Sequence, residues 1–291
     1  MFQSVLAQNS FDTFLKPSDS LNHKRQKSVF IAEAAWVSGA LIGLNQLWYA
    51  DYPKSNFHFI NDNADWMQMD KVGHLYSSYH IGRVGAEALN WSGASKKYQL
   101  IYGASLGFVF LTAVEVLDGH SAEWGASMGD VVANASGTAF YVSQELLWKE
   151  QRIIPKFSFH KTQYSTIRPD ILGSTISEQI LKDYNGQTYW LSANLYSFSK
   201  TSKLPQWLNL AFGYGAEGMI GEKEGNSLQI YTPKPEKFRQ FYLSLDFDLT
   251  RIHTKSHFLK TFFSVFNTIK IPAPTLEYST HSGFKFHAFY F

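Results

Sequence analysis

The sequence predicts an α+β protein, in which a four-helix bundle packed through small residues is followed by a small antiparallel β-rich domain. Three observations predict this class. Long, weakly polar stretches of helical composition fill the first half of the chain. Small residues recur at every fourth position within them, which places these residues on one face of each helix. After Pro155 the pattern changes to short segments in which apolar and polar residues alternate, as in half-buried strands.

Composition limits the classes of function. The 291 residues suffice for one large domain or two ordinary ones. Charged residues make up only 17% and aromatic residues 16%, which suits a protein that meets a membrane, while a mean hydropathy of -0.20 excludes one embedded throughout. A net charge of +2 gives no case for nucleic acid, and the absence of cysteine excludes disulfides and thiolate metal sites. We expect a membrane lipid or an envelope protein as partner; the oligomeric state stays unknown.

Residues 1–27 are interpreted as a signal-peptide remnant and linker. The apolar stretch in MFQSVLAQNS ends in Val-Leu-Ala, the small-residue pattern that signal peptidase reads. A disordered N-terminus is the alternative. The loop charges disagree with export, because basic residues cluster before the first helix, between the second and third and after the fourth, as in an inner-membrane protein with cytoplasmic ends. We favour a location in the cell envelope, at the outer membrane rather than the inner one.

Four helices are expected within a domain of residues 28–150. Their stripes of small residues indicate closely packed helices, either in lipid or in a soluble core, because each interior glycine otherwise costs about 1 kcal/mol. The expected helices cover residues 29–50, 66–90, 98–117 and 128–148. Their stripes are Ala35, Gly39 and Gly43; Ser78, Gly82 and Ala86; Gly103 and Gly107; and Gly129, Ala133 and Gly137.

Residues 151–291 form the predicted β-rich domain. It opens with an irregular stretch, 156–187, that holds one short helix, and five strands follow. They are TYWLSANLYSF, PQWLNLAFGYGA, FRQFYLSLDFDLTRI, PTLEYST and GFKFHAFYF. One short amphipathic helix, in HFLKTFFSVFNTIK, fits either a membrane surface or packing on the sheet. The aromatic last strand is typical of outer-membrane barrels, but five strands are too few to close one, so we predict a small sheet with one apolar face.

Three polar pairs lie at helix ends. They are Asp70 and His74, Glu115 and Asp118, and Asp130 and Asn134. Within each pair the residues are three or four positions apart and share a helix face. If consecutive helices are antiparallel, the three pairs meet at one end of the bundle. We therefore predict one shared polar site.

Three uses of this site remain open. The metal-binding interpretation places a divalent cation such as zinc, manganese or iron on an imidazole and carboxylates, with the ligands His74, Glu115, Asp118 and Asp130. The catalytic interpretation makes His74 a base that Asp70 orients, with Glu115 as a second acid/base group. The structural interpretation is a buried network that fixes the helix register and includes Lys71, Ser78 and Asn134.

The order of these motifs resembles the YfiM-like family of predicted envelope lipoproteins. The motifs read DKVGHLYSS, EVLD and SMGDVVANASG, and they are similar, more loosely, to those of VanZ-like helical membrane proteins. The resemblance covers roughly residues 60–145 and carries over Asp70, Lys71, His74, Ser78, Glu115, Asp118, Ser127, Asp130, Asn134 and Gly137. It implies an envelope location and a small helical module, but no established reaction. This chain departs from the family by lacking the lipoprotein cysteine and by its added β-rich half, in which it resembles longer members from Bacteroidota-type bacteria.

The function expected from these observations is that of a membrane-associated structural or accessory module of the cell envelope, with a buried cluster of histidine and carboxylates. The alternative is a metal- or histidine-dependent hydrolase that acts on an amphiphilic envelope substrate. The sequence does not decide whether the chain is an enzyme.

Overall fold

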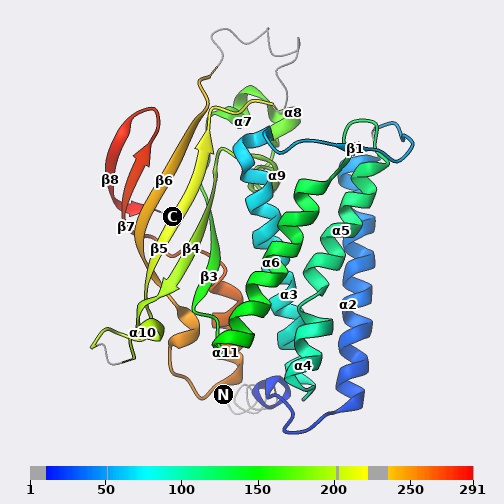
Figure 1. Cartoon of the computed structure of the whole chain (residues 1–291), viewed down its shortest axis with the longest axis vertical. Coiled ribbons are helices and arrows are strands. Elements are labelled where there is room, and N and C mark those ends of the chain that lie inside the picture. Colours follow the sequence, from blue (N-terminus) through cyan, green and yellow to red (C-terminus); the bar gives the residue numbers. More distant parts are fainter. Residues whose placement is uncertain (1–10, 51, 201–202, 222–234, 291) are drawn as a thin grey trace, which may run out of the picture. The chain divides into compact units, whose positions relative to one another are not determined.

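The computed structural model describes residues 11–50, 52–200, 203–221 and 235–290 (Figure 1). The first ten residues of the predicted signal-peptide remnant lie outside the described residues. The chain divides into two compact units. The helical unit comprises residues 1–63, 74–150 and 255–261, and the β unit comprises residues 64–73, 151–254 and 262–291.

The helical unit contains the expected helices together with a short parallel strand pair. Its elements are α2 (His23–Leu44), η1 (Asn45–Tyr49), β1 (Phe59–Ile60), most of α3 (Met69–Trp91), α4 (Lys96–Tyr98), η3 (Gln99–Gly103), α5 (Leu106–Gly119), β2 (Ala126–Ser127) and α6 (Met128–Leu147). Side chains of Asn22 and Ser127 accept hydrogen bonds from backbone N–H groups at the starts of α2 and α6. The predicted third helix is thus three consecutive pieces, α4, η3 and α5.

Glycines hold α3, α5 and α6 in backbone contact. A Cβ atom at Gly107 would lie 2.0 Å from the carbonyl oxygen of Ser78, and one at Gly137 would lie 2.2 Å from that of Leu75. Any larger residue at these two positions would push α5 or α6 away from α3. The small residues of these three helices therefore set the interhelical distance, as the sequence pattern predicts.

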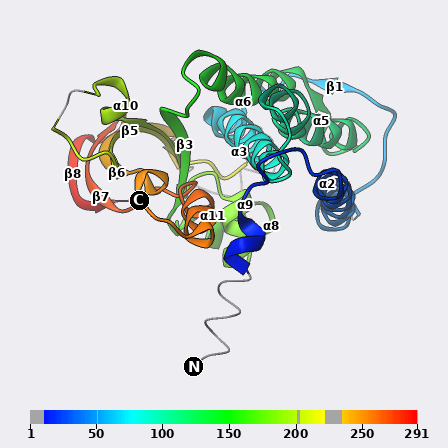
Figure 2. The same ribbon diagram turned by 90° about the horizontal axis from the view of Figure 1, so that it is seen from below.

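Helix α2 does not share this packing, so the predicted four-helix bundle is not confirmed. A Cβ atom at Gly39 or Gly43 would meet nothing within 4 Å. Val29 is the one buried residue of α2, and Figure 2 shows the helix beside the group of α3, α5 and α6. A periodic stripe of small residues permits close packing but does not supply a partner.

Among the described residues, two helices are long and apolar enough to cross a membrane. They are His23–Leu44 and the continuous stretch Lys96–Gly119. A core helix or an N-terminal signal sequence can share these properties, so length and composition alone do not make either helix a span.

The β unit is built on one antiparallel sheet of six strands in sequence order. The strands are β3 (Ile153–Phe159), β4 (Gln187–Asn194), β5 (Leu208–Glu217), β6 (Phe238–Phe247), β7 (Ala273–Ser279) and β8 (Gly283–Tyr290). The last five are the predicted strands. Strand β3 corrects the prediction of irregular structure from residue 156 onward. Pro155 and Lys156 weaken its strand pattern. Among the named strands β3 pairs with β4 alone, so it is an edge strand, and edge strands tolerate proline.

Short helices precede and connect the strands. They are η2 (Asp65–Gln68), α7 (Tyr164–Ile167), α8 (Pro169–Leu172), α9 (Ile176–Lys182), α10 (Leu195–Phe198), η5 (Leu249–Arg251) and α11 (His257–Phe266). Helix α9 begins with a capping box between Thr175 and Glu178. Trp66 and Met69 pack with Leu172, Met219 and Ile220 in an apolar cluster of this unit.

The sheet curls so that one of its faces becomes an interior. Lys156 on β3 forms an ion pair of 2.8 Å with Asp246 on β6, although β4 and β5 lie between these strands. Tyr290 on β8 donates a hydrogen bond to Tyr242 on β6. Figure 2 shows strands β5 to β8 following an arc.

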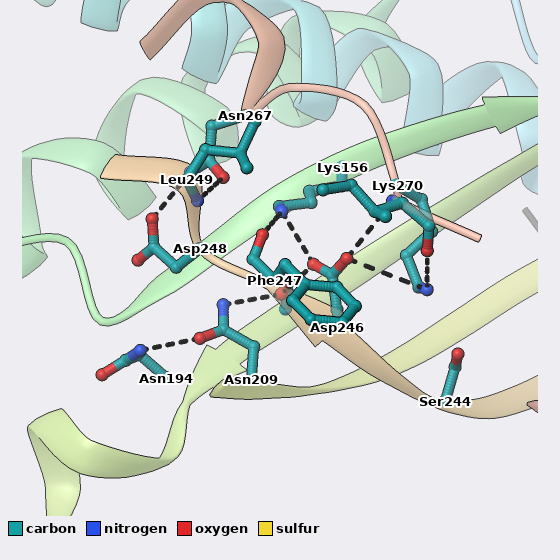
Figure 3. Close-up of polar contacts among 12 residues, drawn as sticks. Lys156, Asn194, Asn209, Ser244, Asp246, Phe247, Asp248, Leu249, Asn267 and Lys270 are labelled. Atoms are coloured by element: carbon teal, nitrogen blue, oxygen red, sulfur yellow. Dashed lines mark hydrogen bonds and ion pairs between the residues drawn. The ribbon is translucent and has the colours of Figure 1, made fainter. Parts of the chain in front are cut away.

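The polarity of this curled sheet is inverted. On β6, Ser244 and Asp246 are buried, whereas Leu243 is 47% and Leu245 is 43% exposed. The predicted apolar face exists, but it points outward. The polar face points inward, where Asp246 lies between two fully buried lysines (Figure 3). An ordinary soluble sheet would bury the leucines instead.

Candidate functional site

The helical unit brings together residues from three helices that are distant in sequence. His74 lies near the start of α3, Glu115 near the end of α5, and Asp130 and Asn134 in the first two turns of α6. The connection between α5 and α6 is short, and Ala126–Ser127 in it pair with Phe59–Ile60. This strand pair fixes the start of α6 beside the end of α5.

The imidazole of His74 is the centre of the arrangement. Its Nδ1 lies 2.9 Å from Oδ1 of Asn134. Its Nε2 lies 3.9 Å from Oε1 of Glu115 and 4.0 Å from Oδ1 of Asp130. The side chain of His74 is 18% exposed, whereas those of the two acids are at most 5% exposed. Histidine is therefore the member of this set that solvent or a ligand can reach.

The contact with Asn134 selects one tautomer of His74. A side-chain amide oxygen only accepts hydrogen bonds, so Nδ1 of His74 carries the proton. In the neutral ring, Nε2 then presents its lone pair toward Glu115 and Asp130. Metal-binding histidines are oriented in this way, by a hydrogen bond from the ring nitrogen that does not bind the metal.

Backbone and hydroxyl groups orient the two carboxylates. The N–H of Ser127 donates to Oε2 of Glu115 at 2.9 Å. The hydroxyl of Ser127 accepts from the N–H of Asp130 at 3.2 Å, which caps α6, and donates to Asp62 at 2.5 Å. Ser127 therefore fixes one carboxylate directly and positions the turn that carries the other.

Burial raises the pKa of Glu115 to about 8. The hydrogen bond from Ser127 and the charge of His74 oppose this rise, while the negative charges of Asp130 and Asp118 add to it. Near neutral pH the Glu115 side chain is therefore largely protonated when no cation is bound.

We expect the stability of the metal-free protein to depend on this proton. The folded chain holds the proton of Glu115 more tightly than the unfolded chain, whose pKa is 4.5. The free energy of unfolding should therefore be highest below pH 4.5, fall as the pH rises to about 8, and level off above it. Urea unfolding across this range should show the fall in the wild type and a weaker one in Glu115→Gln. If the free energy of unfolding fell equally steeply with pH in both proteins, Glu115 would not be the group responsible.

Two of the predicted site residues have other partners within their own units. Asp118 accepts a hydrogen bond of 2.6 Å from the hydroxyl of Tyr49. Asp70, one turn before His74 in α3, accepts one of 2.6 Å from Tyr184 and pairs with Lys71 at 3.1 Å. These hydrogen-bond and ion-pair partners of Asp70 therefore come from the β unit, and Lys71 is one of them.

Ser78 and Asn134 hold the helices together behind the site. The hydroxyl of Ser78 donates to the carbonyl oxygen of Asn134 at 2.6 Å, so α3 and α6 are linked one turn beyond His74. Asn134 is completely buried. Its amide nitrogen has no hydrogen-bond partner within the described part of the chain. That donor could bind the oxygen atom of a further group in the site.

Sequence reasoning missed the contributions of Asp62 and Tyr49. Both contact predicted residues from segments that precede α3. The acidic run NDNAD, which contains Asp62, was the available signal. Its position opposite Ser127 follows from the pairing of β1 with β2, which is too short to leave a strand pattern.

The donor set fits a divalent cation. One imidazole nitrogen and carboxylate oxygens suit zinc, manganese or iron. A tetrahedral zinc ion holds its ligand atoms about 3.3 Å apart. The two distances from Nε2, 3.9 and 4.0 Å, are each less than 1 Å longer than this, so both carboxylates must move toward the imidazole for one cation to bind all three groups.

Comparison with known proteins supports an envelope role for this region. Residues 58–145 match the family model "Predicted periplasmic lipoprotein (DUF2279)". The matched residues include His74, Glu115, Asp130 and Asn134, so the family's similarity covers the whole site. Neither a curated protein nor a solved structure matches the chain. The predicted resemblance to envelope lipoproteins of unknown function is thus supported at the level of the family description.

Proposed function

We propose that this chain is a membrane-associated accessory protein of the cell envelope. In its helical unit, a divalent cation would bind His74, Glu115 and Asp130 and hold three helix ends together. The observation that carries the proposal is the orientation of His74. Its Nδ1 is held by Asn134, and its Nε2 lies about equally far from two buried carboxylates. A cation would replace the proton of Glu115 and balance the charge of both buried carboxylates, whose burial as unpaired anions is otherwise unfavourable.

The role proposed for the cation is structural. Its three ligands come one each from α3, α5 and α6, which are the helices that touch through glycines. A bound cation would therefore join the ends of three helices. The unpartnered amide nitrogen of Asn134 supports the proposal, because it could donate to a water molecule bound to the cation.

The location proposed is the outer membrane. The similarity to predicted periplasmic lipoproteins supports an exported, envelope-associated protein. The amphipathic strands of the β unit support the outer membrane over the inner one, because sheets in lipid are typical of outer membranes. Density-gradient separation of the two membranes tests this, with enrichment in the inner-membrane fraction as the contradicting result.

We expect cation binding to raise the thermal stability of the full chain. A ligand present at 100 times its dissociation constant stabilises the folded state by about 2.7 kcal/mol. Chelator-treated protein should therefore melt several degrees higher after zinc or manganese is added. His74→Ala and Asp130→Asn should abolish the shift, while Glu123→Gln, which removes an exposed acid of the same unit, should retain it. A shift of the same size in all four proteins would rule out this site.

A second candidate function is acid/base hydrolysis of an amphiphilic envelope substrate. Two observations favour it: the partly exposed ring of His74 and the raised pKa of Glu115, which keeps a proton available near neutral pH. His74→Gln should then preserve folding and abolish turnover of envelope lipid in cells. Unchanged lipid turnover in a folded His74→Gln variant would exclude the enzymatic role.

A further inference from the structure

We propose that the outward face of the six-stranded sheet is a lipid-facing surface that lies against the acyl chains of a bilayer. The proposal deepens the membrane association proposed above, by naming the surface responsible. It rests on residues of the β unit only. The polar site of the helical unit plays no part in it.

The first observation is a continuous apolar row across five strands. Directly paired residues on β4 to β8 are Leu191, Phe212, Leu243, Leu276 and Phe286. Each of them is between 43% and 68% exposed. None carries a charge or a hydrogen-bonding group. A row of large exposed side chains of this length is unusual on a soluble surface and marks an interaction site.

The second observation is that aromatic residues flank this apolar row. Two residues further along the strands, the paired residues on β6 to β8 are Phe241, Tyr278 and Phe284. On β4 and β5, Tyr189 and Tyr214 belong to the same row but pack against the cluster of Trp66 and Met69. At the other end of the sheet, Trp207 stacks on Phe247 with ring centroids 5.2 Å apart. Aromatic girdles on both sides of an apolar band are typical of sheets that cross a membrane.

The lengths of two strands also fit a bilayer. Strands β5 and β6 are each 10 residues long, within the range of 9–11 for strands that span a membrane at a tilt of about 45°. An extended strand of this length measures about 33 Å, or about 23 Å along the membrane normal at that tilt. The apolar band of an outer-membrane barrel is about 25 Å tall.

The third observation is the polar interior of the same sheet. Residues on the inward face of the same strands include Ser192, Asn209 and Asp246. The hydroxyl of Ser192 donates a hydrogen bond of 2.6 Å to Asp246, and the side-chain amide of Asn209 donates to Ser192. Lys156 and Lys270 are fully buried beside Asp246 (Figure 3). A polar interior with an apolar exterior is the alternation of membrane sheets and the reverse of soluble ones.

An apolar pocket extends the outward face where β5 begins and β6 ends. It has a volume of about 390 Å³ and is lined by Trp207, Phe247, Leu249, Ile252 and Ile271. All five lining side chains are apolar or aromatic. A pocket of this composition can hold the end of an acyl chain.

The curvature of the sheet favours lipid over a second copy of the chain. The apolar rows run around the convex side of the curl, since the polar face is the interior. A second protein copy would cover only one side of such a convex surface, whereas acyl chains conform to all of it. Six strands are fewer than the eight of the smallest bacterial barrels, and here buried side chains such as Trp190 and Tyr242 fill the interior.

The absence of cysteine from the sequence makes a positional test possible. Leu243→Cys and Leu276→Cys place a thiol on the outward row, and Ser282→Cys places one at the exposed tip of the β7–β8 hairpin. Each full-length variant is labelled with an environment-sensitive fluorophore. The labelled protein is reconstituted into phosphatidylcholine vesicles with or without bromine on the acyl chains.

We expect brominated chains to remove most of the emission at Leu243→Cys and Leu276→Cys, and little of it at Ser282→Cys. If the protein floats with the vesicles but the two row positions stay unquenched, the proposal of a lipid-facing sheet is overturned and the membrane association is not. Protein that fails to float would overturn both. Unquenched row positions, together with disulfide-linked dimers when the unlabelled Leu243→Cys and Leu276→Cys variants are treated with an oxidant, would identify a second chain as the occupant and overturn the proposal.

Discussion

Asp246→Ala is expected to lower the free energy of unfolding of the β unit by about 3–5 kcal/mol, the cost of breaking a buried ion pair by removing one partner. Asp246 is fully buried and lies 2.8 Å from Nζ of Lys156 and 3.8 Å from Nζ of Lys270. Without the carboxylate, two buried ammonium groups would lose their common counter-charge, and Ser192 would lose its acceptor.

The matched control is a surface ion pair of the same unit. Asp170 pairs with Arg168 at 2.9 Å, but its side chain is 63% exposed. Asp170→Ala should therefore cost less than about 1 kcal/mol. Denaturant unfolding of both variants in the full chain, followed by circular dichroism in the strand region, measures the difference. Equal losses in the two variants would show that the interior charges are not desolvated as the structure places them.

The second large effect is expected at the glycines of the helical unit. Gly137→Ala would place a Cβ atom 2.2 Å from the carbonyl oxygen of Leu75 and 3.0 Å from the backbone nitrogen of Tyr79. Helix α6 must then move away from α3, at a cost of about 1–3 kcal/mol or more. The same movement would draw Asn134 away from His74, so affinity for a divalent cation should fall as well.

Gly39→Ala supplies a control of opposite sign. Nothing lies within 4 Å of a Cβ atom at Gly39 in α2. Alanine should therefore stabilise this helix, by up to about 1 kcal/mol. Thermal unfolding of the two variants should move in opposite directions. A destabilised Gly39→Ala together with a neutral Gly137→Ala would contradict the packing described for these helices.

Local sequence patterns predicted the elements well, but not their partners. Strands β4 to β8 follow from clear alternation, and α3, α5 and α6 follow from glycine periodicity. The same periodicity on α2 predicted a fourth packed helix, but no atom lies close to its glycines. The sequence pattern of a glycine stripe is the same whether or not another helix packs against it. Strand β3 was missed because Pro155 and Lys156 interrupt its pattern.

The polarity of the sheet shows a second limit of sequence reasoning. Alternation on β6 separates leucines from Ser244 and Asp246, but it does not say which set faces inward. That choice depends on Lys156 and Lys270, which are far away in sequence and meet Asp246 only when the sheet curls. The candidate site was more predictable, since short connections between antiparallel helices bring their ends together. The roles of Ser127 and Asp62 required the β1–β2 pairing.

Elemental analysis tests the central functional claim most directly. The full-length protein is purified in detergent without chelator, beside His74→Ala, Asp130→Asn and Glu123→Gln. The proposed site predicts one divalent metal ion per chain in the wild type and in Glu123→Gln, and a loss of that metal in the other two variants. Wild-type protein without metal, or metal that persists in both His74→Ala and Asp130→Asn, would contradict the cation site.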